Sequence, residues 1–450
     1  MKEDIVEIKE KVIELLENKK YSELHNYIDK LNSQDISLLF EELSKEDMVL
    51  VFKLLSKDEG ADVFSYMEPD LQEDLISLLT DKELKNVVDE LFMDDTVDLI
   101  EEMPSNVVKR ILKGVNQKDR KLINELLNYP EDSAGSIMTT EFVDLKMNMT
   151  VQSAFERIRE IAIDKETVYT CYVLNSSRQI VGIVGVKDLL IAKQETIIKD
   201  IMETNIVTVN TLDDQEEVVK KFDKYDFIAL PVVDKEKRLV GIVTVDDAID
   251  VLQEENTEDF EIMAAITPSE ESYFKTSTIK HAKNRILWLL LLMISSSITG
   301  PIIINYEEAF AALPLLVAFV PVIMGTGGNC GSQSSTMIIR GMATDEIKLK
   351  DYFRAVWKEL RISLIVGVIL SIANGIRIVI QYNDIQIAIV VGLTLILTVT
   401  LSKFLGCSLP MLAKKLKLDP AIMAAPLITT IVDSCSILIY FQIAIALIQI

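Results

Sequence analysis

The chain has 450 residues and carries 46 lysines and arginines against 70 aspartates and glutamates, a net charge of −24. Such an acidic balance excludes a protein that grips nucleic-acid phosphates, because that requires clustered basic side chains. It favours cations or basic partners, although a surface that merely keeps the protein soluble would have the same composition. The cysteines at 171, 330, 407 and 435 form no CxxC pair, so we expect neither a disulfide framework nor a zinc site.

The charge is unevenly distributed along the chain. Residues 1–271 carry a net charge of −30 and residues 272–450 a net charge of +6. The charged start lacks the apolar core of a signal peptide, so we expect the first half to stay in the cytoplasm. The sequence therefore predicts a multidomain protein in which an acidic soluble part precedes an apolar membrane part.

Residues 1–130 are predicted to form an acidic all-α domain of repeated helices. Apolar clusters recur at helical spacing, as at 38–40, 49–52 and 75–79. Their short, regular spacing is typical of stacked helical hairpins. Predicted helix starts are Ser44, Ser56, Thr80 and Ser105.

Residues 131–253 show an α/β pattern that occurs twice, over 131–200 and 201–253. Each copy contains a β-branched run around a glycine, Gly182 or Gly241, and then an aspartate at a helix start, Asp188 or Asp247. The doubled pattern resembles a tandem pair of CBS domains, a family whose central cleft often binds adenine nucleotides. The resemblance implies that Asp188 and Asp247 contact a ribose, with ATP as a candidate regulatory ligand. The alternative is that each aspartate only caps its helix.

The last part of the chain is predicted to cross a membrane. Five apolar stretches, at 286–306, 309–339, 362–376, 385–402 and 420–450, reach or approach the roughly 20 residues that a spanning helix needs. We therefore expect an α-helical transmembrane domain over 281–450 with five spans, preceded by a connecting helix over 254–280. Lysines and arginines, including Lys403, crowd the loops of one side, and the opposite loops hold only Arg377. This asymmetry predicts a multi-pass cell-membrane protein with its N-terminus in the cytoplasm and its C-terminus outside.

Glycine and amide residues within the second predicted span indicate a pore. Backbone that leaves helical hydrogen bonding inside a membrane is tolerated where it lines a cavity, although glycines also serve as helix-packing notches. The residues concerned are Gly325, Gly327, Gly328, Asn329 and Gln333.

The fifth predicted span contains a carboxylate, Asp433. A charge in an apolar span is costly unless it meets water or a cation. Thr429 and Pro426 precede it, and the proline permits a bend that releases backbone carbonyls. The alternative is that Asp433 only bonds to a neighbouring helix.

Mg²⁺ is the ion that this donor set suits best. Cysteine and histidine clusters, which select zinc or copper, are missing from the sequence. Few carboxylates with amide and backbone oxygens suit Mg²⁺, which keeps most of its waters. One aspartate per chain would make a two-carboxylate ring in a symmetric dimer.

Two motifs carry a second resemblance. GTGGNCGSQSSTMIIRGMAT (325–344) and DPAIMAAPLITTIVDSCSILIY (419–440) look like signatures of the MgtE family of Mg²⁺ transporters. The order of helical domain, CBS pair, connecting helix and five spans is similar too. The resemblance implies a homodimer in the lipid bilayer, with a pore along the subunit interface and Asp433 as the main ion ligand. Some members carry a polar residue before the proline of the fifth span; here Ala425 precedes Pro426, so selectivity at that level would come from backbone or water.

Acidic residues concentrate where the domains are expected to meet. Like charges repel there, and bound Mg²⁺ would bridge them and close the channel. The alternative is that several only solvate the surface. The candidate regulatory Mg²⁺ ligands, at positions that resemble regulatory sites of the family, are Asp62, Asp94, Asp98, Asp214, Glu216, Asp226, Asp247, Asp250, Glu255, Glu258 and Asp259.

Two other functions stay open at this point. One is a transporter of Co²⁺, Mn²⁺ or Ni²⁺. The other is a nucleotide-sensing CBS membrane receptor that transports nothing, which would leave Asp433 and the glycine-rich span unexplained. A GxxxxGK[ST] phosphate loop is missing from the sequence, so we predict no enzyme activity.

Overall fold

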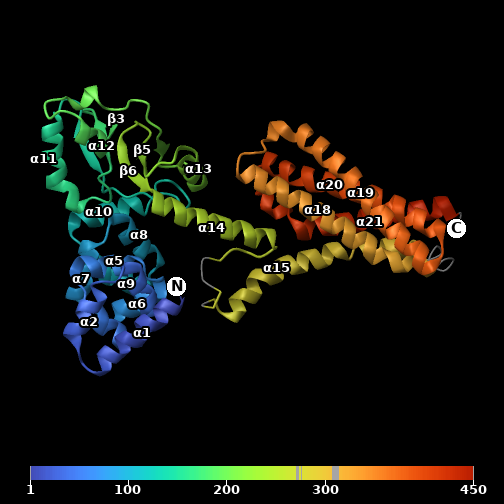
Figure 1. The fold of residues 1–450 in the computed structure, drawn as a ribbon, viewed down its shortest axis with the longest axis horizontal. Coiled ribbons are helices and arrows are strands. Elements are labelled where there is room, and N and C mark those ends of the chain that lie inside the picture. The colour runs from blue at the N-terminus through green and yellow to red at the C-terminus, as the bar shows by residue number, and fades with distance from the viewer. Residues whose placement is uncertain (1, 270–272, 275, 307–313, 449–450) are drawn as a thin grey trace. The chain divides into compact units, whose positions relative to one another are not determined.

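A computed structural model describes residues 2–269, 273–274, 276–306 and 314–448 of the chain. The chain divides into two compact units, Met1–Leu252 and Gln253–Ile450, and each is described by itself (Figure 1).

The first unit begins with an array of short helices. Three of them start behind a hydroxyl side chain that accepts a hydrogen bond from the backbone three residues on, namely Ser44, Ser56 and Thr80. At Ser56 and Thr80 a glutamate completes a capping box. The helices are α1 (Lys2–Glu17), α2 (Tyr21–Ile28), α3 (Ser33–Glu41), α4 (Lys45–Phe52), α5 (Lys57–Ser65), α6 (Pro69–Leu78), α7 (Asp81–Glu90), α8 (Met93–Glu102), α9 (Ser105–Gly114) and α10 (Gln117–Leu126).

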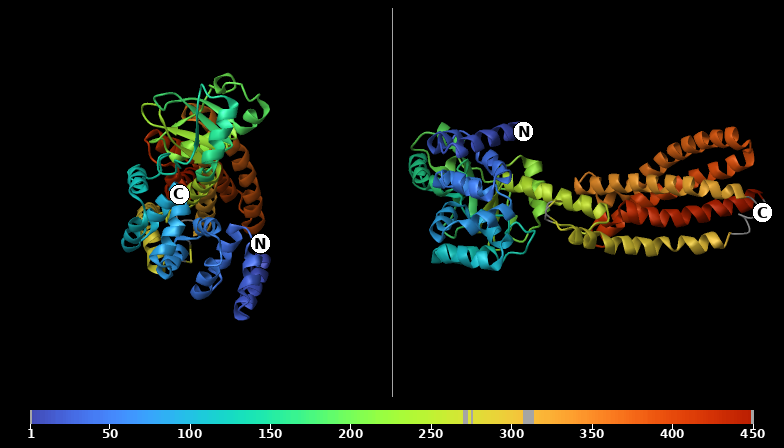
Figure 2. Two further views of the ribbon diagram at one scale, coloured as in Figure 1. Left: turned by 90° about the vertical axis from the view of Figure 1, so that its left-hand side faces the viewer. Right: turned by 90° about the horizontal axis from the view of Figure 1, so that it is seen from below.

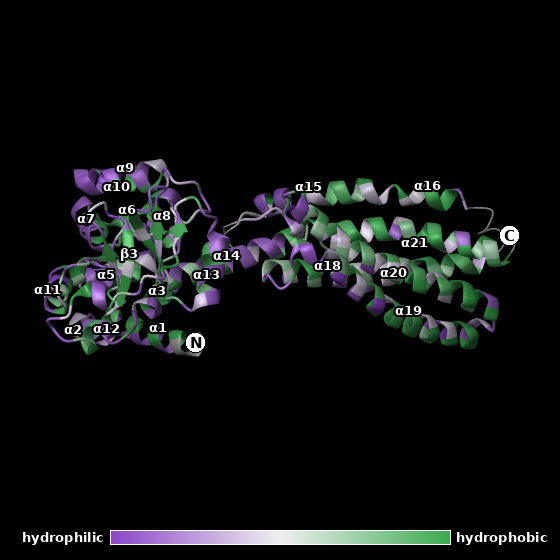
Figure 3. Ribbon diagram, turned by 90° about the horizontal axis from the view of Figure 1, so that it is seen from above, coloured by the Kyte–Doolittle hydropathy of each residue, from purple (hydrophilic) through white to green (hydrophobic). Residues whose placement is uncertain are grey.

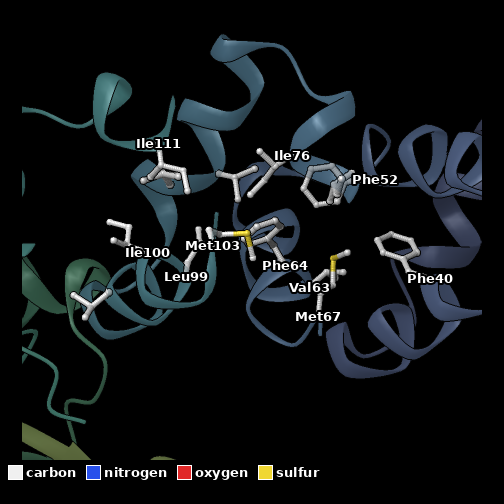
Figure 4. Packing of buried hydrophobic residues seen from close by; sticks show 14 of the residues in the cluster. Phe40, Phe52, Val63, Phe64, Met67, Ile76, Leu99, Ile100, Met103 and Ile111 are labelled. Atoms are coloured by element: carbon white, nitrogen blue, oxygen red, sulfur yellow. The ribbon is translucent and has the colours of Figure 1, made fainter. Parts of the chain in front are cut away.

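The apolar clusters predicted from the sequence meet in one core. Figure 4 shows Phe40, Phe52, Phe64, Ile76 and Ile111 among the side chains that fill the space between these helices. The same core continues into the second α/β copy, so the helical array and that copy fold together. Burial of this apolar surface stabilises helices too short to be stable alone.

Two three-stranded sheets follow, and they have the same topology. In each sheet the central strand pairs in parallel with the first strand and antiparallel with the third. The first copy contains β1 (Val143–Lys146), α11 (Val151–Ile161), η1 (Ala162–Asp164), β2 (Thr170–Leu174), β3 (Ile180–Gly185), α12 (Val186–Ile191) and η2 (Ile198–Asp200). The second contains β4 (Val209–Asn210), α13 (Gln215–Tyr225), β5 (Ala229–Val233), β6 (Leu239–Thr244) and the start of α14 (Val245–Met263).

In each copy, the segment before the first strand pairs with the sheet of the other copy. The backbone of Thr139, which precedes β1, bridges to Ile242 on β6, and that of Glu203, which precedes β4, bridges to Ile183 on β3. The two strand glycines make room for this exchange. A Cβ on Gly241 would lie 2.7 Å from the sulfur of Met138, and one on Gly182 would lie 2.6 Å from the sulfur of Met202. The pair is therefore interlocked.

Among the residues that the structure describes, the second unit contains five helical segments that are long and apolar enough to cross a membrane. Figure 3 shows that hydrophobic residues dominate α19, α20 and α21, whereas the helices of the first unit mix both kinds. Its elements are α15 (Thr278–Ser296), α16 (Thr299–Ile304), η3 (Pro314–Phe319), α18 (Val320–Ala343), η4 (Leu349–Asp351), α19 (Tyr352–Tyr382), α20 (Ile385–Lys415), η5 (Pro420–Met423) and α21 (Ala425–Ile448). Within this unit α18 packs against α20 and α21, and α19 packs against α20 (Figure 2). The predicted fold class, a helical domain, an α/β CBS pair and five apolar helices, is confirmed.

Three details differ from the sequence-based expectations. The glycine-rich stretch is regular α-helix within α18, because glycine permits helix wherever close packing stabilises it. Lys403 lies inside α20 and is buried, not in a loop. The connecting helix ends at Met263, earlier than expected, where Ala265 takes a left-handed conformation and Pro268 cannot continue a helix.

Candidate functional site

One face of α18 is built for close helix packing. Gly327, Gly328 and Gly331 are buried. A Cβ on Gly327 would lie 2.7 Å from a methyl carbon of Thr398 on α20, and one on Gly328 would lie 2.9 Å from a methyl carbon of Thr429 on α21. Small residues here let the three backbones approach one another, as is common in membrane helix pairs. Two of the glycines predicted to line a pore, Gly327 and Gly328, thus lie in helix contacts.

The opposite face of α18 is polar and open. Gly325, Asn329 and Gln333 are exposed and recur every fourth residue, so they form one stripe along the helix. We call these three residues the polar stripe. Amide side chains in an apolar belt require water or another protein surface beside them, because lipid cannot satisfy their hydrogen bonds.

Asp433 lies on α21, which packs against α18. Its side chain is half-buried, and in the part of the chain that the structure describes no hydrogen bond or ion pair reaches its carboxylate. Two hydroxyls close to it in the sequence are already engaged: Thr429 donates to the carbonyl of Pro426 over 2.9 Å, and Ser434 lies 3.0 Å from the hydroxyl of Thr299. The carboxylate is therefore available to a cation. The side chain of Ala425 lies outside the described part of the chain.

The first unit holds a cluster of carboxylates, most of them half-buried. Its members come from one face of α8, two loop positions and the start of α14, and we call it the acidic cluster: Asp94, Asp95, Asp98, Glu141, Glu166, Asp246 and Asp247. Burial and mutual repulsion raise the pKa of Asp94 well above its usual value. The same causes raise the pKa of Asp95 to about 7 and that of Glu166 to about 8. Partial burial, with Asp95 and Asp247 beside it, raises the pKa of Asp98 to about 7, although its side chain keeps contact with solvent.

Two oxygens of this cluster lack a partner. Asp94 Oδ1 and Glu166 Oε2 are buried, and neither forms a hydrogen bond within the described residues. Only some of the cluster is satisfied: Glu141 Oε2 accepts from Thr139 over 2.6 Å, and Asp247 Oδ2 accepts from the Thr244 hydroxyl over 2.5 Å. Buried unsatisfied carboxylate oxygens are costly, and hard oxygen donors of this kind fit Mg²⁺. Within the described ranges no three acidic, histidine or cysteine side chains converge tightly enough to chelate an ion.

The other predicted regulatory ligands lie apart from the acidic cluster or at its edge. Asp214 caps α13 by accepting from the amide of Glu216, whose carboxylate pairs with Lys220 over 2.9 Å. Asp226 ends α13 in a left-handed conformation and is exposed. Asp62 and Asp250 are exposed in the first unit, and partial burial raises the pKa of both. The remaining three lie on α14 in the second unit: Glu255, Glu258 and Asp259.

The two candidate nucleotide contacts have different surroundings. Asp188 is exposed in the first turn of α12. Asp247, in the first turn of α14, is engaged by Thr244 through both its backbone amide and its hydroxyl. Asp247 thus caps its helix and also belongs to the acidic cluster.

Glu141 and Glu166 were missed by sequence reasoning. Each is a single acidic residue in a connecting segment, without periodicity or motif around it. Only the fold brings them beside α8, where Glu141 Oε2 also accepts from the amide of Met93 over 3.4 Å. No signal in a single sequence marks them.

Together these features define a multi-pass α-helical membrane protein that carries a CBS pair. Family comparisons agree along the chain: residues 320–443 match the MgtE family, described as divalent cation transporters, residues 31–132 match the MgtE intracellular N domain, and residues 134–195 and 198–254 match CBS domains. The chain is 37% identical to the magnesium transporter MgtE of Bacillus subtilis over 79% of this chain and 78% of that protein. It is 36% identical to magnesium transporter MgtE of Thermus thermophilus, over 78% and 79%. The chain belongs to the MgtE family, which confirms the resemblance found in the sequence.

Solved structures support the same assignment for the first unit. The soluble part of a magnesium transporter superposes with a TM-score of 0.53 at 32% identity, covering 56% of this chain and 99% of that one. The cytosolic domain of the Mg²⁺ channel MgtE in complex with ATP superposes with a TM-score of 0.51 at 35% identity, covering 53% and 98%.

Proposed function

We propose that this protein is a Mg²⁺ channel whose ion path is lined by the polar stripe of α18 and by Asp433 of α21. The observation that carries the proposal is the half-buried carboxylate of Asp433, which has no partner among the described residues of an apolar unit. A carboxylate in that setting is stabilised by a cation. The relatives named as magnesium transporters support Mg²⁺ over Co²⁺, Mn²⁺ and Ni²⁺. The channel moves its ion down the electrochemical gradient and catalyses no reaction.

A pore of this kind requires two copies of the chain. A single unit leaves the polar stripe open, and one carboxylate cannot neutralise a divalent ion. A two-fold dimer presents two copies of Asp433 and covers both stripes. With two carboxylates and few other ligands, the site holds Mg²⁺ with most of its waters in place. We place the dimer in a cell membrane with its N-terminal unit in the cytoplasm, because basic residues crowd the loops of that side.

Ion flux into proteoliposomes tests the pore. We expect Asp433→Asn to reduce Mg²⁺ entry, followed with an internal dye, by about tenfold or more, because one lost carboxylate per chain removes the charge that holds the ion. Asp345→Asn is the matched control: this carboxylate is exposed in the same unit, and its left-handed backbone suits asparagine. Equal flux in both variants would remove Asp433 from the mechanism. No flux from folded wild type would favour the receptor that transports nothing.

We further propose that cytoplasmic Mg²⁺ closes the channel through the acidic cluster. The unsatisfied oxygens of Asp94 and Glu166 support this, because an ion that bridges carboxylates binds best to the arrangement that brings them together. The start of α14 carries Asp246 and Asp247, and the same helix continues to Met263, so it joins the cluster to the membrane unit. The same proposal assigns further regulatory Mg²⁺ sites to the other acidic residues on α14 and to Asp62, Asp214, Glu216, Asp226 and Asp250.

Gating is tested separately from conduction. We expect wild-type flux to fall as Mg²⁺ is raised on the side of the N-terminal unit, and Asp94→Asn to keep its flux under the same conditions. Asp89→Asn is the control, since Asp89 is an exposed acid on α7 that pairs with Lys85. If Asp94→Asn is inhibited at the wild-type concentration, the cluster is not the sensor.

Nucleotide binding by the CBS pair is a second proposal. The ATP complex of a 35% identical cytosolic domain favours it, and Asp188 is exposed where a ribose contact is expected. Titration calorimetry with ATP should show binding by the wild type and loss in Asp188→Ala. Unchanged binding in that variant would assign Asp188 to the helix end alone.

A further inference from the structure

Three membrane helices meet at a buried ion pair. Lys403 on α20 lies 3.5 Å from Glu359 on α19, and their side chains are only 6% and 12% exposed. Ser334 on α18 joins them: its hydroxyl donates to Glu359 and accepts from the Lys403 ammonium over 3.2 Å. Each of the three groups comes from a different helix, so the contact fixes all three helices relative to one another (Figure 1).

The packing around the pair leaves little freedom. A Cβ on Gly406 of α20 would collide with the carbonyl oxygen of Gly331 on α18, so these two helices touch backbone to backbone one turn away. The next residue along α18, Ser335, donates to the carbonyl of Met423 over 2.7 Å, in the 3₁₀ turn that leads into α21. Adjacent serines of α18 are thus tied on one side to α19 and α20 and on the other to the start of the helix that carries Asp433.

A buried ion pair stabilises the contact between these helices less than apolar side chains of the same size would. Two buried charges cost more in desolvation than apolar side chains of the same size, and the best-attested use of such a pair is to fix register. Apolar packing alone tolerates sliding by a fraction of a turn, whereas a hydrogen-bonded lysine, carboxylate and hydroxyl accept one arrangement. Neither charge belongs to the polar stripe, and each already neutralises the other, so neither is suited to hold the transported ion.

We propose that Lys403 and Glu359, joined through Ser334, are positioning residues that set the depth of α18 along α20, and with it the level of the polar stripe relative to Asp433. They do not touch the ion. This inference rests on the proposed channel function. It predicts that disturbing the pair alters which ions pass, because the stripe then presents its amides and carbonyls at a different level.

The experiment compares Mg²⁺ and Ca²⁺ entry into proteoliposomes, because the ratio of the two fluxes does not depend on how much of the protein is folded. We expect Lys403→Met and Glu359→Gln each to lower Mg²⁺ flux by about tenfold or more and to shift the flux ratio, as small misplacements of positioning groups do. The exchanged pair, Lys403→Glu with Glu359→Lys, should return the ratio to within about twofold of wild type. Lys358→Met is the matched control, since this exposed lysine adjoins Glu359 and should leave the ratio unchanged.

The outcomes separate the two hypotheses. If the wild type conducts and Lys403→Met and Glu359→Gln leave the flux ratio unchanged, the positioning role is overturned and the proposed channel function still stands. Wild type that conducts neither ion would overturn the channel, and the positioning role with it. If the single variants do not fold, the exchanged pair decides: a folded exchange with the wild-type ratio supports the proposal, and an exchange that does not fold or that changes the ratio contradicts it.

Discussion

At the scale of single residues, the acidic cluster makes the stability of the fold depend on pH. Burial, and the repulsion of neighbouring carboxylates, raise the pKa of Asp94, Asp95, Asp98, Asp247 and Glu166, to about 7 for Asp95 and about 8 for Glu166. In the unfolded chain the same groups titrate near 4. Between those values the folded protein holds more protons than the unfolded chain, so its stability decreases as pH rises. The loss is complete once pH passes the folded-state values, where the cluster carries its full repelling charge.

We therefore expect Mg²⁺ to stabilise the protein more at pH 8.5 than at pH 6. At pH 6 protons already neutralise part of the cluster, and an added ion must displace them. At pH 8.5 the pH is above the pKa values of Asp95, Asp98 and Glu166, and the ion relieves the repulsion between their charges. Thermal unfolding of metal-free protein, with and without added Mg²⁺ at each pH, measures the difference. In the double variant Asp94→Asn, Glu166→Gln, the increase in unfolding temperature that Mg²⁺ causes should become smaller and nearly independent of pH. An equal shift at both values of pH in wild type would contradict this account.

The same cluster marks where residue-level prediction from sequence ends. Asp94, Asp98 and Asp247 could be singled out because acidic residues gather on α8 and at the start of α14. Glu141 and Glu166 could not, because their contact with α8 depends on how the interlocked CBS copies pack on the helical array. Lys403 illustrates the opposite error: an isolated lysine near the end of an apolar stretch was assigned to a loop, and only its partner on another helix explains its burial.

At the scale of elements, the contact of α18 with α20 depends on residues without side chains. We expect Gly406→Ala to destabilise the membrane unit by about 1–3 kcal/mol, because the added methyl meets the backbone of Gly331 and the helices must separate. Gly375→Ala on α19 is the matched control: among the described residues no neighbouring atom lies within 4 Å of the place that its added methyl would take, and alanine favours helix. Thermal unfolding in detergent compares the two.

Flux measurements on the same variants connect packing to conduction. Separation of α18 from α20 moves the polar stripe, so Gly406→Ala should also lose Mg²⁺ flux, and Gly375→Ala should keep it. If both variants unfold at the wild-type temperature, the contact at Gly331 is not tight in the folded protein.

Element boundaries were predictable where local chemistry decides them and not where packing does. Ser56 and Thr80 start helices as expected, because a capping box operates within one turn. The glycine-rich stretch was expected to leave helical geometry, and it stays helical because Gly327, Gly328 and Gly331 gain contacts with α20 and α21. The sequence pattern cannot distinguish a glycine that breaks a helix from one that brings two helices together.

At the scale of the whole molecule, composition and hydropathy were sufficient to predict an acidic soluble part and five apolar spans. A surface that faces water favours charged residues, whereas a surface that faces lipid favours apolar ones. What a single chain leaves open is the surface along α18. Asn329 and Gln333 are exposed there, on a helix whose other face is packed against α20 and α21. A second copy that covers this stripe would convert two open faces into one enclosed path.

This arrangement predicts which residues of two chains come close. We expect Gln333→Cys, treated with a short bis-maleimide in the membrane, to give a covalent dimer, because residue 333 of each chain faces the shared path. A maleimide bridge is needed because a disulfide joins Cα atoms no more than about 6.8 Å apart, which is closer than the walls of a path for a hydrated ion. Ile372→Cys is the control: this side chain is 58% exposed on α19, on a surface that the proposal assigns to lipid. The native Cys171, Cys330 and Cys407 are buried, but Cys435 on α21 is only half-buried, so both variants are made in a Cys435→Ser background. A dimer from Ile372→Cys with none from Gln333→Cys would move the subunit interface to α19 and leave the polar stripe without a role in conduction.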